Sequence, residues 1–116
     1  MKILDYHEQE APMSHIKKYE LIKGDAVVEI DQYLHDNPET IIALAYFDFD
    51  LYKPTKKCLA AINGYLTKGS IIGFDELHLH EFPGETLALK EVFGLDKYEL
   101  IRSPYSAAYQ AYMVIE

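Results

Sequence analysis

Acidic residues in two close pairs offer the clearest chemistry in this sequence. Asp48 and Asp50 lie one residue apart in the stretch YFDFDLYKPT, and Asp75 and Glu76 are adjacent in the stretch SIIGFDEL. Carboxylate oxygens are the ligands that hard cations such as Mg²⁺ and Ca²⁺ prefer, at about 2.0 to 2.6 Å. Without a cation, carboxylates gathered in one place raise one another's pKa values. The two pairs therefore predict a metal or ligand site wherever the fold brings them together.

Both acidic pairs follow apolar segments that have the pattern of buried strands. Residues 41–47 are apolar at every position, which is typical of a central parallel strand covered on both faces, and residues 70–74 form a second such segment. A helix predicted between them allows a right-handed crossover, which makes the strands parallel and brings both carboxyl ends to one edge of the sheet. Neighbouring strands lie roughly 4.8 Å apart. We therefore expect the four carboxylates to converge.

The other segments complete an alternating order. A short strand at residues 19–22 closes at a turn of Gly24 and Asp25, and Asp25 caps a helix that ends near Asn37. A helix opened by Pro54 runs to a break at residues 67–69, and another runs over residues 85–93 to Gly94. Strands at residues 98–102 and 109–115 predict an antiparallel hairpin, and residues 1–17 are loop or short helix. The predicted fold class is α/β, in one domain of residues 1–116.

Each acidic residue also has a plain structural explanation. Asp is common at strand ends because it starts turns and caps the next helix, and Asp50 precedes Pro54 closely enough to do so. In LHLHEFPG, His78, His80 and Glu81 suggest a second ligand set. Two histidines so placed in a loop are more often solvated than metal-bound, and the spacing forces no third ligand. Both interpretations remain open at this stage.

Composition excludes several classes of function. A formal net charge of −8 argues against nucleic acid or an anionic membrane surface as the main partner. The longest apolar run is far too short for a spanning helix, and the first residues lack the core of a signal peptide. The single cysteine, Cys58, allows no internal disulfide. We expect a soluble, cytoplasmic protein.

Three stretches carry a resemblance to a known family. IIALAYFDFDLYKPTKKCL, KGSIIGFDEL and FPGETLALKEVFG are similar to the second half of class I S-adenosylmethionine-dependent methyltransferases, in the macrocin O-methyltransferase group. The resemblance covers residues 18–116. It implies a partial Rossmann-like methyltransferase sheet, with parallel core strands and a C-terminal antiparallel hairpin.

The resemblance also implies roles for named residues. Asp48, Asp75 and Glu76 match the acids that hold a Mg²⁺ ion in that family, and Asp48 is the best match for the group that helps to deprotonate the acceptor. The turn of Gly24 and Asp25 matches a segment near the adenine end of S-adenosylmethionine. Glu76 stands where the family usually has Asp, which lengthens one ligand arm. The implied acceptor is a hydroxyl group of a sugar or another small molecule.

Part of the family's cofactor site has no counterpart in this sequence. The six glycines are scattered, and no G-x-G-x-G occurs, so the glycine-rich loop and the ribose-binding acid of the family are absent. The family's strand order also loses its middle members, which leaves a long apolar strand edge that invites pairing. We infer a truncated enzyme whose exposed sheet edge is covered in a homodimer.

Three functions are consistent with these observations. The first is a Mg²⁺-dependent O-methyltransferase whose isolated chain has little or no turnover. The second is a non-enzymatic, dimeric, metal-binding α/β domain. The third is a metal-assisted hydrolase that uses the acids together with His78 and His80. Binding of S-adenosylmethionine separates the first from the other two.

Overall fold

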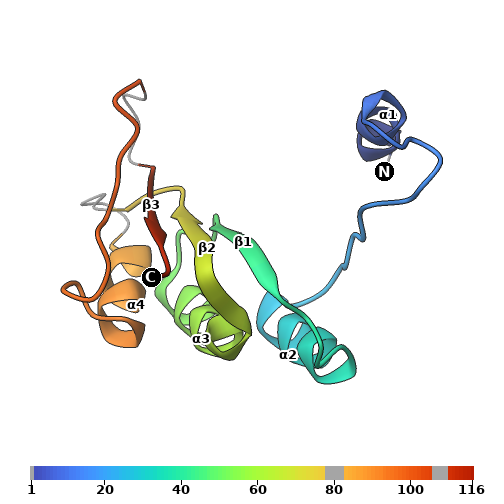
Figure 1. The fold of residues 1–116 in the computed structure, drawn as a ribbon. Coiled ribbons are helices and arrows are strands. Elements are labelled where there is room, and N and C mark those ends of the chain that lie inside the picture. Colours follow the sequence, from blue (N-terminus) through green and yellow to red (C-terminus); the bar gives the residue numbers. More distant parts are fainter. Residues whose placement is uncertain (1, 78–82, 106–109) are drawn as a thin grey trace.

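The computed structural model describes residues 2–77, 83–105 and 110–116, and its described residues form a three-stranded sheet with helices packed against it (Figure 1). The strand order is β1-β2-β3, with β1 and β2 parallel and β3 antiparallel to β2. This arrangement confirms the α/β class and the parallel core pair. The elements are α1 (Lys2–Glu10), α2 (Ala26–Asp36), β1 (Ile42–Phe47), α3 (Tyr52–Ile62), the 3₁₀ turn η1 (Asn63–Tyr65), β2 (Leu66–Phe74), α4 (Gly84–Val92) and β3 (Ala111–Val114).

The hydrophobic core lies between one face of the sheet and the helices α2, α3 and α4. In the parallel register Ala45 is opposite Ile72 and Phe47 is opposite Phe74. The side chains of Ile72 and Phe74 are fully buried, and the rings of Phe47 and Phe74 stack with centroids 5.7 Å apart. Leu59 of α3 is also fully buried in this core. Burial of this face fixes the register, because a one-residue slip would turn every core side chain outward.

Local signals set the helix boundaries much as the sequence predicts. Asp25 caps α2, since its carboxylate accepts a hydrogen bond from the amide of Val27 at 2.9 Å, and Asn37 is the C-terminal cap. Pro54 lies in the first turn of α3, where its missing N–H costs little. Gly94 follows α4 with φ of 77°, which suits glycine at a helix end.

The break predicted at residues 67–69 is wrong, because these residues belong to β2. Leu66 pairs with Ile42 and Ile71 pairs with Leu44, so β2 holds extra residues between two pairs. Gly69 lies among these extra residues and has a φ of 90°, a conformation that glycine adopts readily. A glycine inside a strand therefore marks a bulge here and not the end of the strand.

Two of the predicted strands do not form as such. Residues 19–22 are not in a strand, and residues 98–102 contribute one antiparallel bridge, in which the backbones of Ile101 and Tyr112 exchange hydrogen bonds of 2.8 and 2.9 Å. A strand needs a neighbour along its length, and its own side chains do not supply one. The N-terminal segment instead contains α1, which has no buried residue and lies away from the sheet on an extended connection (Figure 1).

The prediction that the first core strand is covered on both faces is also wrong. β1 is an edge strand, and its residues Leu44 and Tyr46 are 64% and 57% exposed. They lie on the face of the sheet opposite the helices. Among the described residues, no helix is both long enough and apolar enough to cross a membrane.

Candidate functional site

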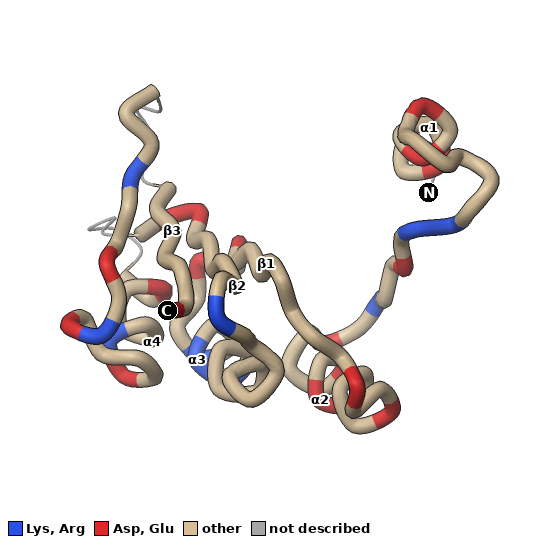
Figure 2. Tube along the Cα trace, viewed as in Figure 1, with Lys and Arg blue, Asp and Glu red and all other residues tan. Residues whose placement is uncertain are grey.

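The four predicted carboxylates do gather at the carboxyl ends of β1 and β2. Phe47 and Phe74 end the two strands opposite each other, and the amide of Asp75 donates to the carbonyl of Phe47 at 3.0 Å. Figure 2 shows acidic segments where these two strands end. The carboxylates of Asp48, Asp50 and Asp75 all act on the pKa of Glu76. The parallel crossover therefore produces the convergence that the sequence predicts.

Asp50 and Glu76 are partly buried members of this acidic cluster. Burial raises the pKa of Glu76, and the carboxylates of Asp50, Asp75 and Asp48 raise it further. Asp50 Oδ1 and Glu76 Oε2 are buried, and neither has a hydrogen-bond partner among the described residues. Asp50 also has φ of 58°, a left-handed conformation that few residues other than glycine adopt. Two buried carboxylate oxygens without partners are suited to a bound cation or a shared proton.

Asp75 has a different partner, the hydroxyl group of Tyr46. This hydroxyl donates to Asp75 Oδ1 at 2.7 Å, and Gln110 Nε2 lies 3.4 Å from the same oxygen. The hydrogen bond to Asp75, followed by burial and nearby carboxylates, raises the pKa of Tyr46 to about 12. The ring of Tyr46 lies over Gly73, where an added Cβ would be 2.7 Å from the ring. Gly73 therefore leaves room for the tyrosine that holds Asp75.

The donor atoms have the chemistry of a hard-cation site, but they are not arranged as a closed set of ligands. Asp48 is exposed, whereas Asp75 and Glu76 are partly buried. Among the described residues, no three His, Cys, Asp or Glu side chains are placed to hold one metal ion. The carboxylates and the two unpartnered oxygens fit Mg²⁺ by donor type. Binding would require the side chains to turn toward a common point.

Glu85 is a functional candidate that the sequence analysis missed. Its side chain is fully buried at the start of α4, and it accepts hydrogen bonds from the amides of Phe49 (3.4 Å) and Glu76 (3.1 Å). Burial raises the pKa of Glu85, while hydrogen bonds from the amides of Glu76, Phe49 and Asp50 oppose that rise. The available signal was an acid directly after Pro-Gly at the start of a helix. Acidic residues are common in the first turn of a helix, so this pattern does not distinguish Glu85 from an ordinary one.

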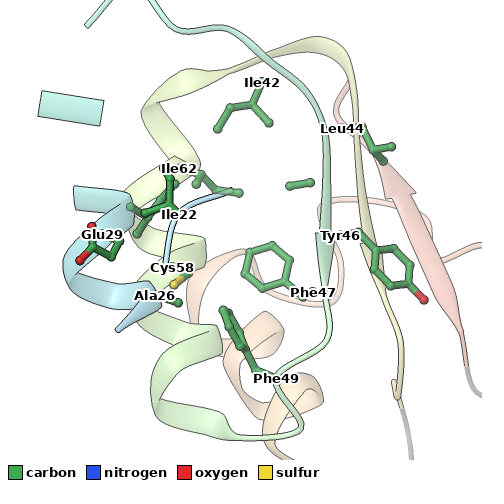
Figure 3. Close-up of a pocket in the computed structure, with 12 residues that line it drawn as sticks. Ile22, Ala26, Glu29, Ile42, Leu44, Tyr46, Phe47, Phe49, Cys58 and Ile62 are labelled. Atoms are coloured by element: carbon green, nitrogen blue, oxygen red, sulfur yellow. The ribbon is translucent and has the colours of Figure 1, made fainter. Parts of the chain in front are cut away.

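The predicted cofactor-binding turn has a structural role of its own. Asp25 caps α2, as described above, and an added Cβ on Gly24 would come within 2.4 Å of the carboxylate of Glu29. Beside this turn an open pocket of about 400 Å³ runs along β1. Figure 3 shows Phe47, Phe49 and Cys58 on one side of β1 and Leu44 and Tyr46 on the other. The pocket lies between β1, the edge strand of the sheet, and the helices α2 and α3.

The histidine hypothesis falls on residues that the structure does not describe. His78, His80 and Glu81 lie within residues 78–82, which are outside the described ranges.

Tyr52 belongs to the stretch YFDFDLYKPT that contains the first acidic pair. Its hydroxyl group accepts a hydrogen bond from Lys56 at 3.0 Å and contacts Glu91. Tyr52 thus joins α3 to α4 through its hydroxyl group.

Comparison with solved structures identifies the origin of this arrangement. The apo structure of CalS11, a TDP-rhamnose 3'-O-methyltransferase of calicheamicin biosynthesis, matches 97% of the chain at 46% sequence identity with a TM-score of 0.88. A second crystal structure of CalS11 matches with a TM-score of 0.89 at the same identity. In sequence and fold the chain is therefore similar to one part of that methyltransferase. No protein-family model and no curated protein matches it.

The similarity is nearly complete for this chain and partial for the solved enzyme. The chain spans 48% and 44% of the two CalS11 chains. This result confirms the resemblance to a methyltransferase and the Rossmann-like fold class. It also means that the sheet described above corresponds to less than half of a methyltransferase of that kind.

Proposed function

We propose that this chain forms the acidic, acceptor-binding part of an S-adenosylmethionine-dependent O-methyltransferase that acts on a sugar hydroxyl group. The similarity to a TDP-rhamnose 3'-O-methyltransferase over 97% of the chain carries this proposal. The gathering of acids at the carboxyl edge of the sheet supports it, because ligands of open α/β sheets bind at that edge.

In the proposed reaction, a hydroxyl oxygen of the sugar attacks the methyl carbon of the sulfonium cofactor. The new O–CH₃ bond forms as the S–CH₃ bond breaks, the sulfur leaves as a neutral thioether, and the hydroxyl proton passes to a base. Asp48 is our candidate for this base because it is exposed at the edge where the acids gather. Asp75 and Glu76, with Asp48, would hold Mg²⁺, which when bound lowers the pKa of the acceptor hydroxyl.

The cofactor would be held only partly by residues of this chain. Gly24 and Asp25 would lie near the adenine, while no glycine-rich loop exists in the sequence to approach the methionine part. We therefore expect weak binding of S-adenosylmethionine and little or no turnover by this chain alone. Turnover would require the part of the cofactor site that these residues do not contain.

Calorimetric titration of S-adenosylmethionine into the purified chain, with and without Mg²⁺, tests the proposal. We expect binding that Mg²⁺ strengthens, and we expect the variant Asp75→Asn to lose the effect of Mg²⁺. Glu91→Gln is a matched control, since Glu91 pairs with Lys56 on the outer side of α4. A folded chain that binds neither Mg²⁺ nor S-adenosylmethionine would contradict the proposal.

A further inference from the structure

The pairing of β1 and β2 stops just before the acidic residues begin. Phe47 and Phe74 form the last pair of the register, and the bond from the amide of Asp75 to the carbonyl of Phe47 is the last in the ladder between these strands. Beyond it the chain continues as two separate connections, one with Asp48 and Asp50 and one with Glu76. Backbone groups that leave a ladder and stay buried need other partners.

The carboxylate of Glu85 supplies such a partner to both connections. Its Oε1 accepts the amide of Phe49 at 3.4 Å, and its Oε2 accepts the amide of Glu76 at 3.1 Å. Each of its oxygens thus holds one of the two connections. Phe49 lies between the two acids of the first pair, and Glu76 is itself an acid of the second pair.

The surroundings of Glu85 favour a carboxylate over other side chains. The side chain is fully buried, so its charge is costly unless hydrogen bonds offset the loss of water. Backbone amides provide those bonds, and the first turn of α4 adds the positive end of a helix dipole. A glutamine of the same length keeps one oxygen acceptor and therefore only one of the two connections.

Gly84 brings Glu85 to this position. A Cβ at residue 84 would lie 2.5 Å from the amide nitrogen of Tyr52 and 2.8 Å from the carbonyl carbon of Leu51. The start of α4 therefore touches the backbone that follows the first acidic pair. Glu85, the next residue along the chain, therefore begins beside the connection that carries the first acidic pair.

We propose that Glu85 is a positioning residue that ties the two acid-bearing connections together and sets the separation of Asp48 and Asp50 from Asp75 and Glu76. The positioning role rests on the proposed function. The hydrogen-bonded bridge does not, because it is a property of the folded chain. Without the bridge, the connection that carries Asp50 would lose its tie to the connection that carries Glu76.

Amide hydrogen exchange measured by NMR tests the bridge independently of any ligand. In Glu85→Gln we expect exchange at Phe49 or Glu76 to accelerate by about tenfold, because one charged hydrogen bond is lost. The amides of Ile72 and Phe74 in β2 should keep their protection, whereas a general loss of stability would accelerate all four. Glu91→Gln, an exposed acid on the same helix, should leave all four unchanged.

Mg²⁺ titration of the same variants tests the positioning role. We expect Glu85→Gln to bind Mg²⁺ about tenfold more weakly than the wild type, as removal of a ligand-orienting group does. If the wild type binds no Mg²⁺, the proposed metal role fails while the exchange data still judge the bridge. Unchanged exchange at both Phe49 and Glu76 in Glu85→Gln would overturn the inference. If that variant does not fold, absence of protection at these two amides in the wild type would overturn it.

Discussion

At the scale of single residues, the acids at this sheet edge differ in what surrounds them. Glu85 is fully buried, and backbone amides offset its charge. Glu76 is partly buried beside other carboxylates, so its pKa is raised. Asp75 accepts a hydrogen bond from a tyrosine, and Asp48 is exposed. One cluster thus contains an acid that bridges two backbone segments, an acid whose pKa is raised by burial and by neighbouring carboxylates, and an acid exposed to solvent.

The pair of Tyr46 and Asp75 leads to a prediction about pH. The pKa of Tyr46 is raised to about 12 because its hydroxyl donates to the Asp75 carboxylate. The folded chain therefore holds this proton more tightly than the unfolded chain, in which tyrosine has a pKa of about 10. The resulting stabilisation is fully present below about pH 10 and is lost as the pH rises toward 12.

The variant Asp75→Asn should lower the pKa of Tyr46 toward that of an ordinary tyrosine, because the amide keeps an acceptor oxygen and loses the charge. NMR titration of chain labelled at the tyrosine ring carbons measures this shift, with Tyr46→Phe to assign the signal. An unchanged titration in Asp75→Asn would mean that the hydrogen bond does not form in solution.

At the scale of elements, the contact between α4 and the connection from β1 to α3 is a close backbone approach. An added Cβ at Gly84 would meet backbone atoms of Asp50, Leu51 and Tyr52 at distances of 3.1, 2.8 and 2.5 Å. Backbone atoms cannot move aside to relieve a close contact as the end of a flexible side chain can. The helix and the connection must therefore shift together if residue 84 gains a side chain.

We expect Gly84→Ala to destabilise the fold by about 1 to 3 kcal/mol, the usual cost of overpacking a tight contact. Gly64→Ala is the matched control, since a Cβ at residue 64 meets no atom within 4 Å. The midpoint of urea unfolding measures both. Equal midpoints for the two variants would contradict the close approach of α4.

The elements that the sequence predicts well are those whose signals are local. The cap at Asp25, the proline in the first turn of α3 and the apolar run before Asp48 all act within a few residues, and the structure contains α2, α3 and β1 there. Strand formation at residues 19–22 depends on a neighbour that sequence does not specify, and no strand forms there. The bridge by Glu85 joins it to Phe49, 36 residues away along the chain, so no local sequence pattern predicts it.

At the scale of the whole molecule, the described residues cover one face of the sheet and leave Leu44 and Tyr46 exposed on the other. The helices bury the face with Phe47, Ile72 and Phe74, while Leu44 and Tyr46 are exposed on the opposite face. Parallel strands are normally buried on both faces. β1 also has a free edge, and its sequence, IALAYF, contains no charge or proline that would discourage pairing. A surface of this kind favours association.

We propose that two copies of the chain associate through the free edge of β1, related by a two-fold axis, because each copy then supplies partners for the other's unpaired backbone groups. Sedimentation velocity over a range of protein concentrations should show a dimer. Leu44→Lys should shift the chain to monomer, since it places a charge on the contact surface beside that edge. Leu87→Lys, on an exposed position of α4, should leave the dimer intact.

The net charge of −8 opposes self-association at long range. Added salt screens this repulsion and leaves the apolar contact in place, so the dimer should become more stable as the salt concentration rises. A wild-type chain that stays monomeric at every concentration and salt level would contradict pairing through β1.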